Sequence, residues 1–274
     1  TEAYDNVLLR LNDESPRVVI FATIAAGHLG NPRDEVLSLL SRNANSDVYL
    51  RHAAVVALAT SQYPSALANL AMHKDSAVRL AAVLALRKLE SPLLSNFLSD
   101  SNQDVATEAT RAIHDVPVAK ALGSVAESLP EAKGYAWQRR ALSASERLGL
   151  DVYLHNVISF ALDDSNSIRM RMLALQILNT WQHPPVRERV DGKWWPAKQT
   201  TSRNIELIRD GIPKLIAHLS ESLADPTVDA LLFESLKLAQ KYKVGLPEEL
   251  SYSILEDDSP VSYTHLTLPT SDLE

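Results

Sequence analysis

A nine-residue pattern that recurs about every 30 residues constrains the fold of this chain more than any other feature of its sequence. In residues 78–86, counted from Val78 as position 0, small or apolar residues stand at positions 0, 4, 7 and 8. These positions share one face of an α-helix, so the segment is predicted to be helical. Residues 50–58 repeat the pattern closely. Further matches, with decreasing fidelity in the last three, lie at residues 18–26, 105–113, 137–145, 168–176 and 228–236.

The residue at position 4 marks each copy of the pattern. The markers are Ala22, Ala54, Ala82, Ala109, Ala141, Met172 and Leu232, and successive markers lie 32, 28, 27, 32, 31 and 60 residues apart. A steady period interrupted by one long step is the signature of a solenoid with an insertion. Because a single helix pair cannot bury its apolar face, stability is expected to come from the stacking of neighbouring pairs.

Polar turns that contain Asp, Ser, Asn or Pro precede most of these helices, and such residues cap helix N-termini or suit the first helical turn. Shorter amphipathic stretches lie between the turns, so each repeat is predicted to be helix, turn, helix. Only 8 Gly and 4 Phe occur beside many Ala and Leu, which favours helix over sheet. We predict an all-α fold over residues 1–260, an α-α superhelix of about seven helical hairpins with a loop insertion at about 182–204. The alternative is a helical bundle with accidental periodicity.

This helix-turn-helix pattern resembles HEAT repeats of the short bacterial type, also found in phycobilin lyases, in which the second helix reads roughly D-x-x-V-R-x-x-A-x-x-A-L. The resemblance covers most of residues 5–257 and is strongest around Val78 and Arg79. It implies a HEAT-like solenoid joined by a ladder of Asp and Arg side chains. Because Ala106, Gln138 and Asp229 occupy the Arg position, the ladder is expected to be incomplete.

The sequence offers no motif for catalysis, cofactor binding or metal binding. The net charge of -7 argues against a nucleic acid partner. The 8 His are never three or four residues apart, there is no Cys, and no nucleophile elbow or phosphate-binding glycine loop occurs. The longest uncharged stretch, residues 53–72, contains polar residues and a Pro, so we predict two helices and no membrane insertion.

Two sets of charged residues have an alternative functional interpretation. The pairs Asp163-Asp164 and Asp257-Asp258 suit a metal or acid–base chemistry, but their place ahead of helices favours capping. The basic residues Arg139-Arg140, Arg169 and Arg171 suit an anion site, although a solvated face is the simpler interpretation.

The predicted insertion breaks the helical period and contains two of the 4 Trp of the chain, Trp194 and Trp195. Pro184 and Pro185 end the preceding helix, and the sequence Asp-Gly at 191–192 predicts a tight turn. Long loops in compact arrays are often functional. The candidate contact residues of this loop are Arg187, Arg189, Trp194 and Trp195. The alternative is that Trp181, Trp194 and Trp195 fold back to seal the groove between repeats.

The insertion also resembles a more particular family. The matching residues are Trp181, Pro184, Pro185, Arg187, Arg189, Val190, Asp191, Gly192 and Trp194. They resemble the middle region of large bacterial proteins that join a quinoprotein dehydrogenase-like β-propeller, HEAT repeats and a c-type cytochrome. This resemblance implies that the enzyme chemistry and haem lie outside these residues, and that the protein is exported or periplasmic. Two alternatives stay open, a lyase-like HEAT protein that acts on a bound chromophore and a free cytoplasmic adaptor.

Helix geometry predicts a partner surface in the first three repeats. Positions 2, 5 and 6 are expected to face away from the core. The candidate contacts there are Ile20, Ile24, His52, Val55, Val56, Leu80, Val83 and Leu84, with Thr23 beside them. Because this row is nearly all apolar, we expect it to contact a protein or an adjacent domain of the same polypeptide. A phase error of one residue, or burial of the row by tight curvature, is the alternative.

The last residues, 261–274, look foreign to the repeat, because VSYTHLTLPT resembles a translated sequencing adapter. We expect this tail not to pack on the repeats, and both ends of the chain look cut. A natural loop with a short strand is the alternative.

Overall fold

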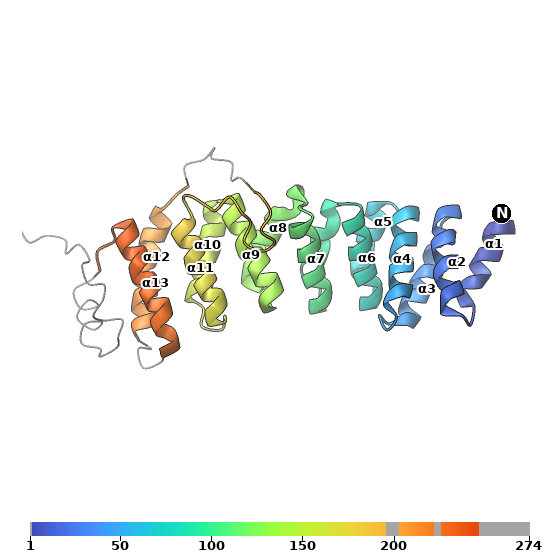
Figure 1. Cartoon of the computed structure of the whole chain (residues 1–274), viewed down its shortest axis with the longest axis horizontal. Coiled ribbons are helices and arrows are strands. Elements are labelled where there is room, and N and C mark those ends of the chain that lie inside the picture. The colour runs from blue at the N-terminus through green and yellow to red at the C-terminus, as the bar shows by residue number, and fades with distance from the viewer. Residues whose placement is uncertain (1, 196–202, 222–225, 247–274) are drawn as a thin grey trace, which may run out of the picture. The chain divides into compact units, whose positions relative to one another are not determined.

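The computed structural model describes residues 2–195, 203–221 and 226–246, without the side chains of residues 226 and 227. Its described residues are helical, apart from loops and one isolated antiparallel bridge between Arg187 and Trp194. Within each part of the described chain, helices pack against nearby helices in a repeat-like arrangement (Figure 1), which confirms the predicted all-α fold class. The contacts group into two compact units, Thr1–Ser128 and a second that begins at Leu129.

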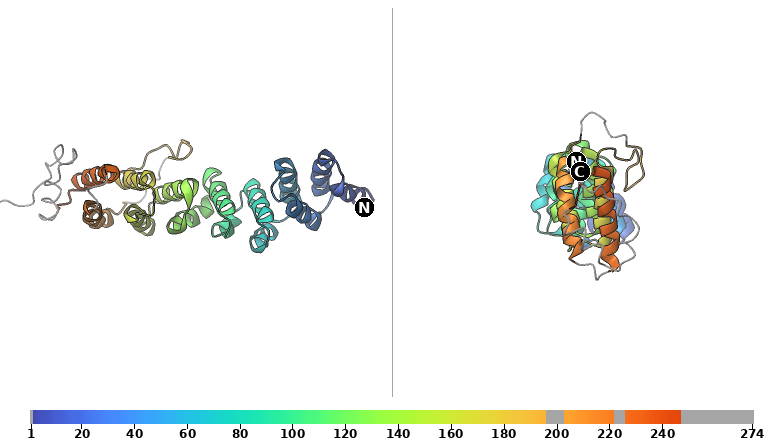
Figure 2. Two further views of the ribbon diagram at one scale, coloured as in Figure 1. Left: turned by 90° about the horizontal axis from the view of Figure 1, so that it is seen from below. Right: turned by 90° about the vertical axis from the view of Figure 1, so that its left-hand side faces the viewer.

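The first unit pairs long second helices with shorter first helices. Its helices follow one another in chain order from blue to green (Figure 2). In chain order its elements are α1 (Glu2–Leu9), η1 (Arg10–Asn12), α2 (Pro16–Leu29), α3 (Arg33–Asn43), α4 (Val48–Ser61), α5 (Pro64–Ala68), η2 (Asn69–Met72), α6 (Ser76–Lys88), η3 (Pro92–Phe97), α7 (Gln103–Asp115), η4 (Ala119–Ala121) and α8 (Leu122–Glu127). The second helices pack in series, α2 on α4, α4 on α6 and α6 on α7.

Short polar side chains start three of these second helices, as the turns predict. Asp47 accepts from the backbone N–H of Tyr49 at 2.7 Å, and Asp75 accepts from that of Ala77 at 2.9 Å. Asn102 does the same for Asp104 at 2.9 Å. Each cap satisfies a backbone donor that lacks a partner within its helix, which fixes where α4, α6 and α7 begin.

Small residues let the second helices approach closely. The markers Ala54, Ala82, Ala109 and Ala141 are fully buried, each with 0% exposure. The closest approach is at Gly27 of α2, where a Cβ atom would lie 2.5 Å from the Cα atom of Ala57 in α4. Larger side chains at these positions would separate the stacked helices.

The second unit continues with longer helices. Its elements are η5 (Leu129–Glu131), α9 (Gly134–Leu148), α10 (Asp151–Leu162), α11 (Ile168–Thr180), α12 (Glu206–Ser220) and α13 (Pro226–Tyr242). Helix α11 packs against α9, α10 and α13. The hydroxyl of Tyr242 in α13 donates to the carbonyl of Leu178 in α11 at 2.7 Å, and burial raises the pKa of Tyr242 to about 12.

The structure corrects the register of the sixth repeat. Met172, the predicted marker, is only half-buried, whereas Ala174 is fully buried. The buried residues of α11 are Met170, Arg171, Ala174, Leu175, Ile177 and Leu178, with the same spacing as Val78, Arg79, Ala82, Val83, Ala85 and Leu86 in α6. The predicted pattern was therefore two residues early in α11, and Arg171 occupies the position of Arg79.

A ladder of polar contacts links turns to second helices. The Arg79 guanidinium donates to both carboxylate oxygens of Asp100, at 2.7 and 2.8 Å, and this hydrogen bonding raises the pKa of Arg79. Gln138 stands at the same position in α9, and its amide donates to the Asn166 side chain at 3.0 Å. A neutral pair therefore replaces the ion pair at α9, where sequence analysis had treated Gln138 as a break in the ladder.

Candidate functional site

The insertion leaves the helical array at Trp181 and contains a short hairpin, residues 186–195, here called the insertion hairpin. Backbone N–H groups of Glu188 and Trp195 donate to the carbonyls of Lys193 and Val186, at 2.8 and 2.7 Å. Gly192 closes the turn with φ +71, a left-handed backbone conformation that glycine adopts without strain. The predicted Asp-Gly turn is thus present, although sequence analysis had not predicted the hairpin pairing.

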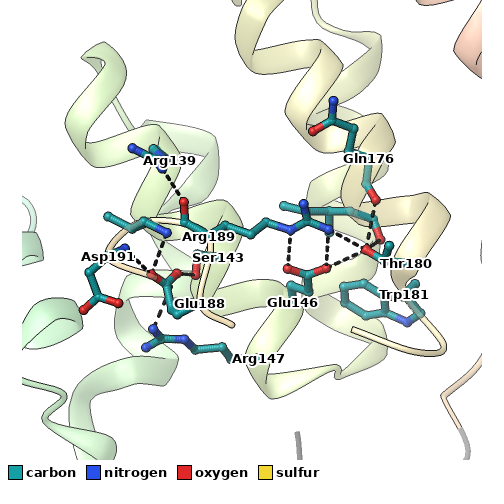
Figure 3. A network of polar contacts seen from close by, with 12 residues as sticks. Arg139, Ser143, Glu146, Arg147, Gln176, Thr180, Trp181, Glu188, Arg189 and Asp191 are labelled. Atoms are coloured by element: carbon teal, nitrogen blue, oxygen red, sulfur yellow. Dashed lines mark hydrogen bonds and ion pairs between the residues drawn. The ribbon is translucent and has the colours of Figure 1, made fainter. Parts of the chain in front are cut away.

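Glu188 of the hairpin is buried against α9, and its side chain has 0% exposure. The Ser143 hydroxyl donates to its carboxylate, and the Arg147 guanidinium lies 3.4 Å from the same oxygen (Figure 3). The other carboxylate oxygen accepts from the backbone N–H groups of Val190 and Asp191, the latter at 2.7 Å. A buried carboxylate with this many donors is compensated, so Glu188 fastens the hairpin to α9.

Arg189 makes a second anchor beside the first. Its guanidinium donates to both oxygens of Glu146, at 2.7 and 3.1 Å, and to the Thr180 hydroxyl at 2.7 Å (Figure 3). The Thr180 hydroxyl in turn donates to Glu146 or to the backbone of α11. The backbone carbonyl of Arg189 accepts from Arg139. The hairpin is therefore tied to α9 and α11 at once.

Two stacks of Arg on Trp complete the attachment. The guanidinium of Arg147 lies 4.4 Å from the ring centroid of Trp195, and that of Arg203 lies 5.3 Å from Trp181. Arg203 also donates to the Trp181 carbonyl at 3.0 Å. Burial lowers the pKa of the Arg203 guanidinium, and the nearby Glu146 carboxylate opposes this change.

The structure gives different roles to the residues predicted in the insertion. Arg189 is structural, whereas Arg187 reaches only the Gly192 carbonyl at 3.5 Å. Trp181 is completely buried and Trp195 half-buried, as expected if they seal the repeats, while Trp194 is 67% exposed and does not. Sequence analysis missed Glu188 and Glu146, although Glu146, a charged residue on the buried side of α9, was a usable signal.

The insertion hairpin lies on one defined face of α9. Its contacts are Arg139 at position 2 and Ser143 at position 6 of the repeat pattern, followed by Glu146 and Arg147. We call positions 2 and 6 of the second helices the second-helix face. In the first unit this face is polar in α7, with Thr107 and Arg111, and mostly apolar in α2, α4 and α6, where it consists of Ile20 and Ile24, His52 and Val56, and Leu80 and Leu84.

The prediction that position 5 faces away from the core was wrong. Val55 and Val83 are buried, with 6% and 0% exposure, and Thr23 is also at 0%. At about 100° per residue, position 5 lies only about 140° from position 0, and each second helix packs against neighbours on two sides. The buried arc is therefore wide enough to include it. His52 is exposed, and Ile20, Ile24, Val56, Leu80 and Leu84 are half-buried.

The described residues give no support to the metal-binding alternative. They contain no group of three or more His, Asp or Glu that could hold a metal ion. Asp164 instead pairs with Arg171 and His218, and the hydrogen bond from His218 is the main cause of its lowered pKa. None of the described helices combines the length and apolarity needed to cross a membrane. Asp257-Asp258 and the tail at 261–274 lie outside the described residues.

No protein-family model matches this chain, and a search of curated proteins finds no matching relative.

Proposed function

We propose that this chain is a non-catalytic scaffold of the HEAT type, whose second-helix face in α2, α4 and α6 binds a protein or an adjacent domain of the same polypeptide. The observation that carries this proposal is the insertion hairpin. On α9 the second-helix face already serves as a docking surface for another segment of chain. In α2, α4 and α6 the same face is mostly apolar and keeps part of its surface accessible.

The composition of the face in α2, α4 and α6 suits a macromolecular partner. Five of its six residues are Ile, Val or Leu, and they come from three successive second helices. Burial of such side chains contributes roughly 25 cal/mol per Å² of apolar surface, whichever partner covers it. A contiguous apolar row that stays accessible on a folded domain is the kind of surface that partners cover.

The proposal also covers the kind of larger protein in which this scaffold occurs. Trp181, Arg189 and Gly192, which carry the resemblance to propeller, HEAT and cytochrome proteins, are also the residues that seal, anchor and turn the insertion. In this proposal the partner is a dehydrogenase-like or cytochrome-type domain of an exported protein, and the scaffold itself performs no chemistry.

Site-specific photo-crosslinking tests the proposed face. A benzoylphenylalanine residue is introduced at position 56 or 84 in cells that express the natural full-length protein, and cross-linked peptides are sequenced. The matched control is position 72, where Met72 is 90% exposed and lies outside the face. Both face positions should give cross-links to one and the same partner domain, and position 72 should not. Cross-links that are equally frequent at all three positions would contradict the proposal.

A further inference from the structure

One exposed aromatic ring in the second unit holds two guanidinium groups. Tyr135 is 43% exposed, and the Cζ atoms of Arg169 and Arg139 lie 4.5 and 5.7 Å from its ring centroid. Arg169 also donates to the Tyr135 hydroxyl at 3.2 Å. Arg139 donates to the backbone carbonyl of Arg189, so the insertion hairpin fixes its direction (Figure 3). Two helices, α9 and α11, and the hairpin thus bring these groups together.

Neither guanidinium has a carboxylate partner among the described residues. Four other arginines of the second unit do have one: Arg147 pairs with Glu188, Arg171 with Asp164, Arg189 with Glu146 and Arg209 with Glu206. Arg139 and Arg169 instead share a neutral ring and neutral oxygen acceptors. Their charges repel each other, and each guanidinium keeps donors that these contacts do not use.

The surroundings add positive potential. Tyr135 and Arg169 are each the second residue of a helix, and neither α9 nor α11 has a side-chain cap or an acidic residue in its first turn. In the first unit, α4, α6 and α7 each begin with an Asp or Asn cap. An anion placed between the two guanidinium groups would therefore meet two uncapped helix N-termini, whose partial positive charge attracts it.

We propose that Tyr135, Arg139 and Arg169 bind a side-chain carboxylate from an acidic segment of the partner protein. Guanidinium forks match the planar carboxylate, and the exposed edge of the Tyr135 ring can contact the methylene groups of a Glu side chain. This inference rests on the proposed scaffold function, since it names the chemistry of one contact with the partner. It predicts that the partner presents acidic residues to α9 and α11.

The test uses the full chain with 15N-labelled arginine and follows the side-chain Nε–H resonances by NMR. The probes are an acetylated glutamate tetramer, the matching glutamine tetramer and inorganic phosphate. The glutamate peptide should shift the Arg139 and Arg169 resonances, and the glutamine peptide should not. The double variant Arg139→Gln/Arg169→Gln should bind the glutamate peptide about tenfold more weakly. The control Arg17→Gln removes an exposed arginine that has no ion pair among the described residues, and should change nothing.

Tyr135→Phe is a second variant that keeps the ring and removes only the acceptor that positions Arg169, and it should also weaken peptide binding. Equal shifts with both peptides, or equal losses in Arg17→Gln, would overturn the proposal. A response to phosphate without a response to the glutamate peptide would overturn it too, because the ligand would then be a phosphate group. Because no partner protein is used, failure here leaves the cross-linking test of the scaffold function intact.

Discussion

Helices α6 and α9 are both second helices of their repeats, yet their second-helix faces differ in polarity. Their second-helix faces consist of Leu80 and Leu84 in α6, and of Arg139 and Ser143 in α9. The polar face is covered by the insertion hairpin, and the apolar one stays partly accessible. The comparison teaches that the residues at two positions of the same helix geometry decide whether this face holds a polar segment of the chain or stays apolar and partly accessible.

The two faces differ in the contacts that an occupant must make. On α9 the hairpin buries the Glu188 carboxylate, which is stable only because Ser143, Arg147 and two backbone N–H groups donate to it or face it. An apolar row needs no individual hydrogen-bond or charge partners. Any occupant of matching shape that covers it gains free energy from the burial of apolar surface.

The largest loss of stability is expected on α9, where the buried Glu188 carboxylate holds the insertion hairpin. Glu188→Gln leaves an amide against two backbone N–H groups and removes the charge that faces Arg147, so the hairpin should lose about 3 kcal/mol of its docking free energy. Hydrogen exchange should show loss of protection at the N–H groups of Glu188 and Trp195. Glu206→Gln, which removes an exposed ion pair with Arg209, should change little. Unchanged protection in Glu188→Gln would show that the hairpin is held by other contacts.

The next prediction tests whether the second helices of both units are equally closely packed at their buried positions. Ala82→Leu in α6 and Ala141→Leu in α9 add bulk at fully buried positions, and each should lower the free energy of unfolding by about 1 to 3 kcal/mol. Ala54→Leu should behave in the same way. Ala59→Leu, at a half-buried position of α4, is the control and should be tolerated. If chemical denaturation gives unchanged midpoints for the buried sites, the assigned stacking is wrong.

A smaller difference in stability is expected between Gly-to-Ala variants at two glycines inside helices. At Gly27 an added Cβ would meet the Ala57 backbone at 2.5 Å, so Gly27→Ala should destabilise by about 1 kcal/mol even after the gain in helix propensity. At Gly211 the nearest atom is a methyl carbon of Ile158 at 3.0 Å, which can move. Gly211→Ala should therefore be neutral or slightly stabilising in thermal melts. The reverse order would mean that α2 and α4 are less closely packed than described.

Much of the fold could be predicted from the sequence, because the spacing of Ala54, Ala82, Ala109 and Ala141 reflects a physical need for small residues at helix contacts. The burial of Val55 and Val83 could not be read from a single helix, since it depends on the number of neighbours. The pattern also failed in α11, where it was matched two residues before Ala174.

The site was harder to predict than the fold. Arg187, Arg189, Trp194 and Trp195 were selected because they are large or charged, but Glu188 between them is the buried anchor. Its partner residues Ser143 and Arg147 lie in α9, about 40 residues earlier in the chain. Pairings over such a distance follow from tertiary structure, which local patterns do not contain.

Partner binding by the second-helix face of α4 and α6 is the central claim, and one measurement tests this binding most directly. The dissociation constant of the domain identified by cross-linking is measured by calorimetry for the natural protein, for Val56→Asp/Leu84→Asp and for Met72→Asp. Circular dichroism melts check that each variant folds. The double variant should remain folded and bind about a hundredfold more weakly, while Met72→Asp should bind normally. Unfolding of the double variant would show that Val56 and Leu84 belong to the core, and unchanged affinity would show that the partner binds elsewhere; either result would contradict the claim.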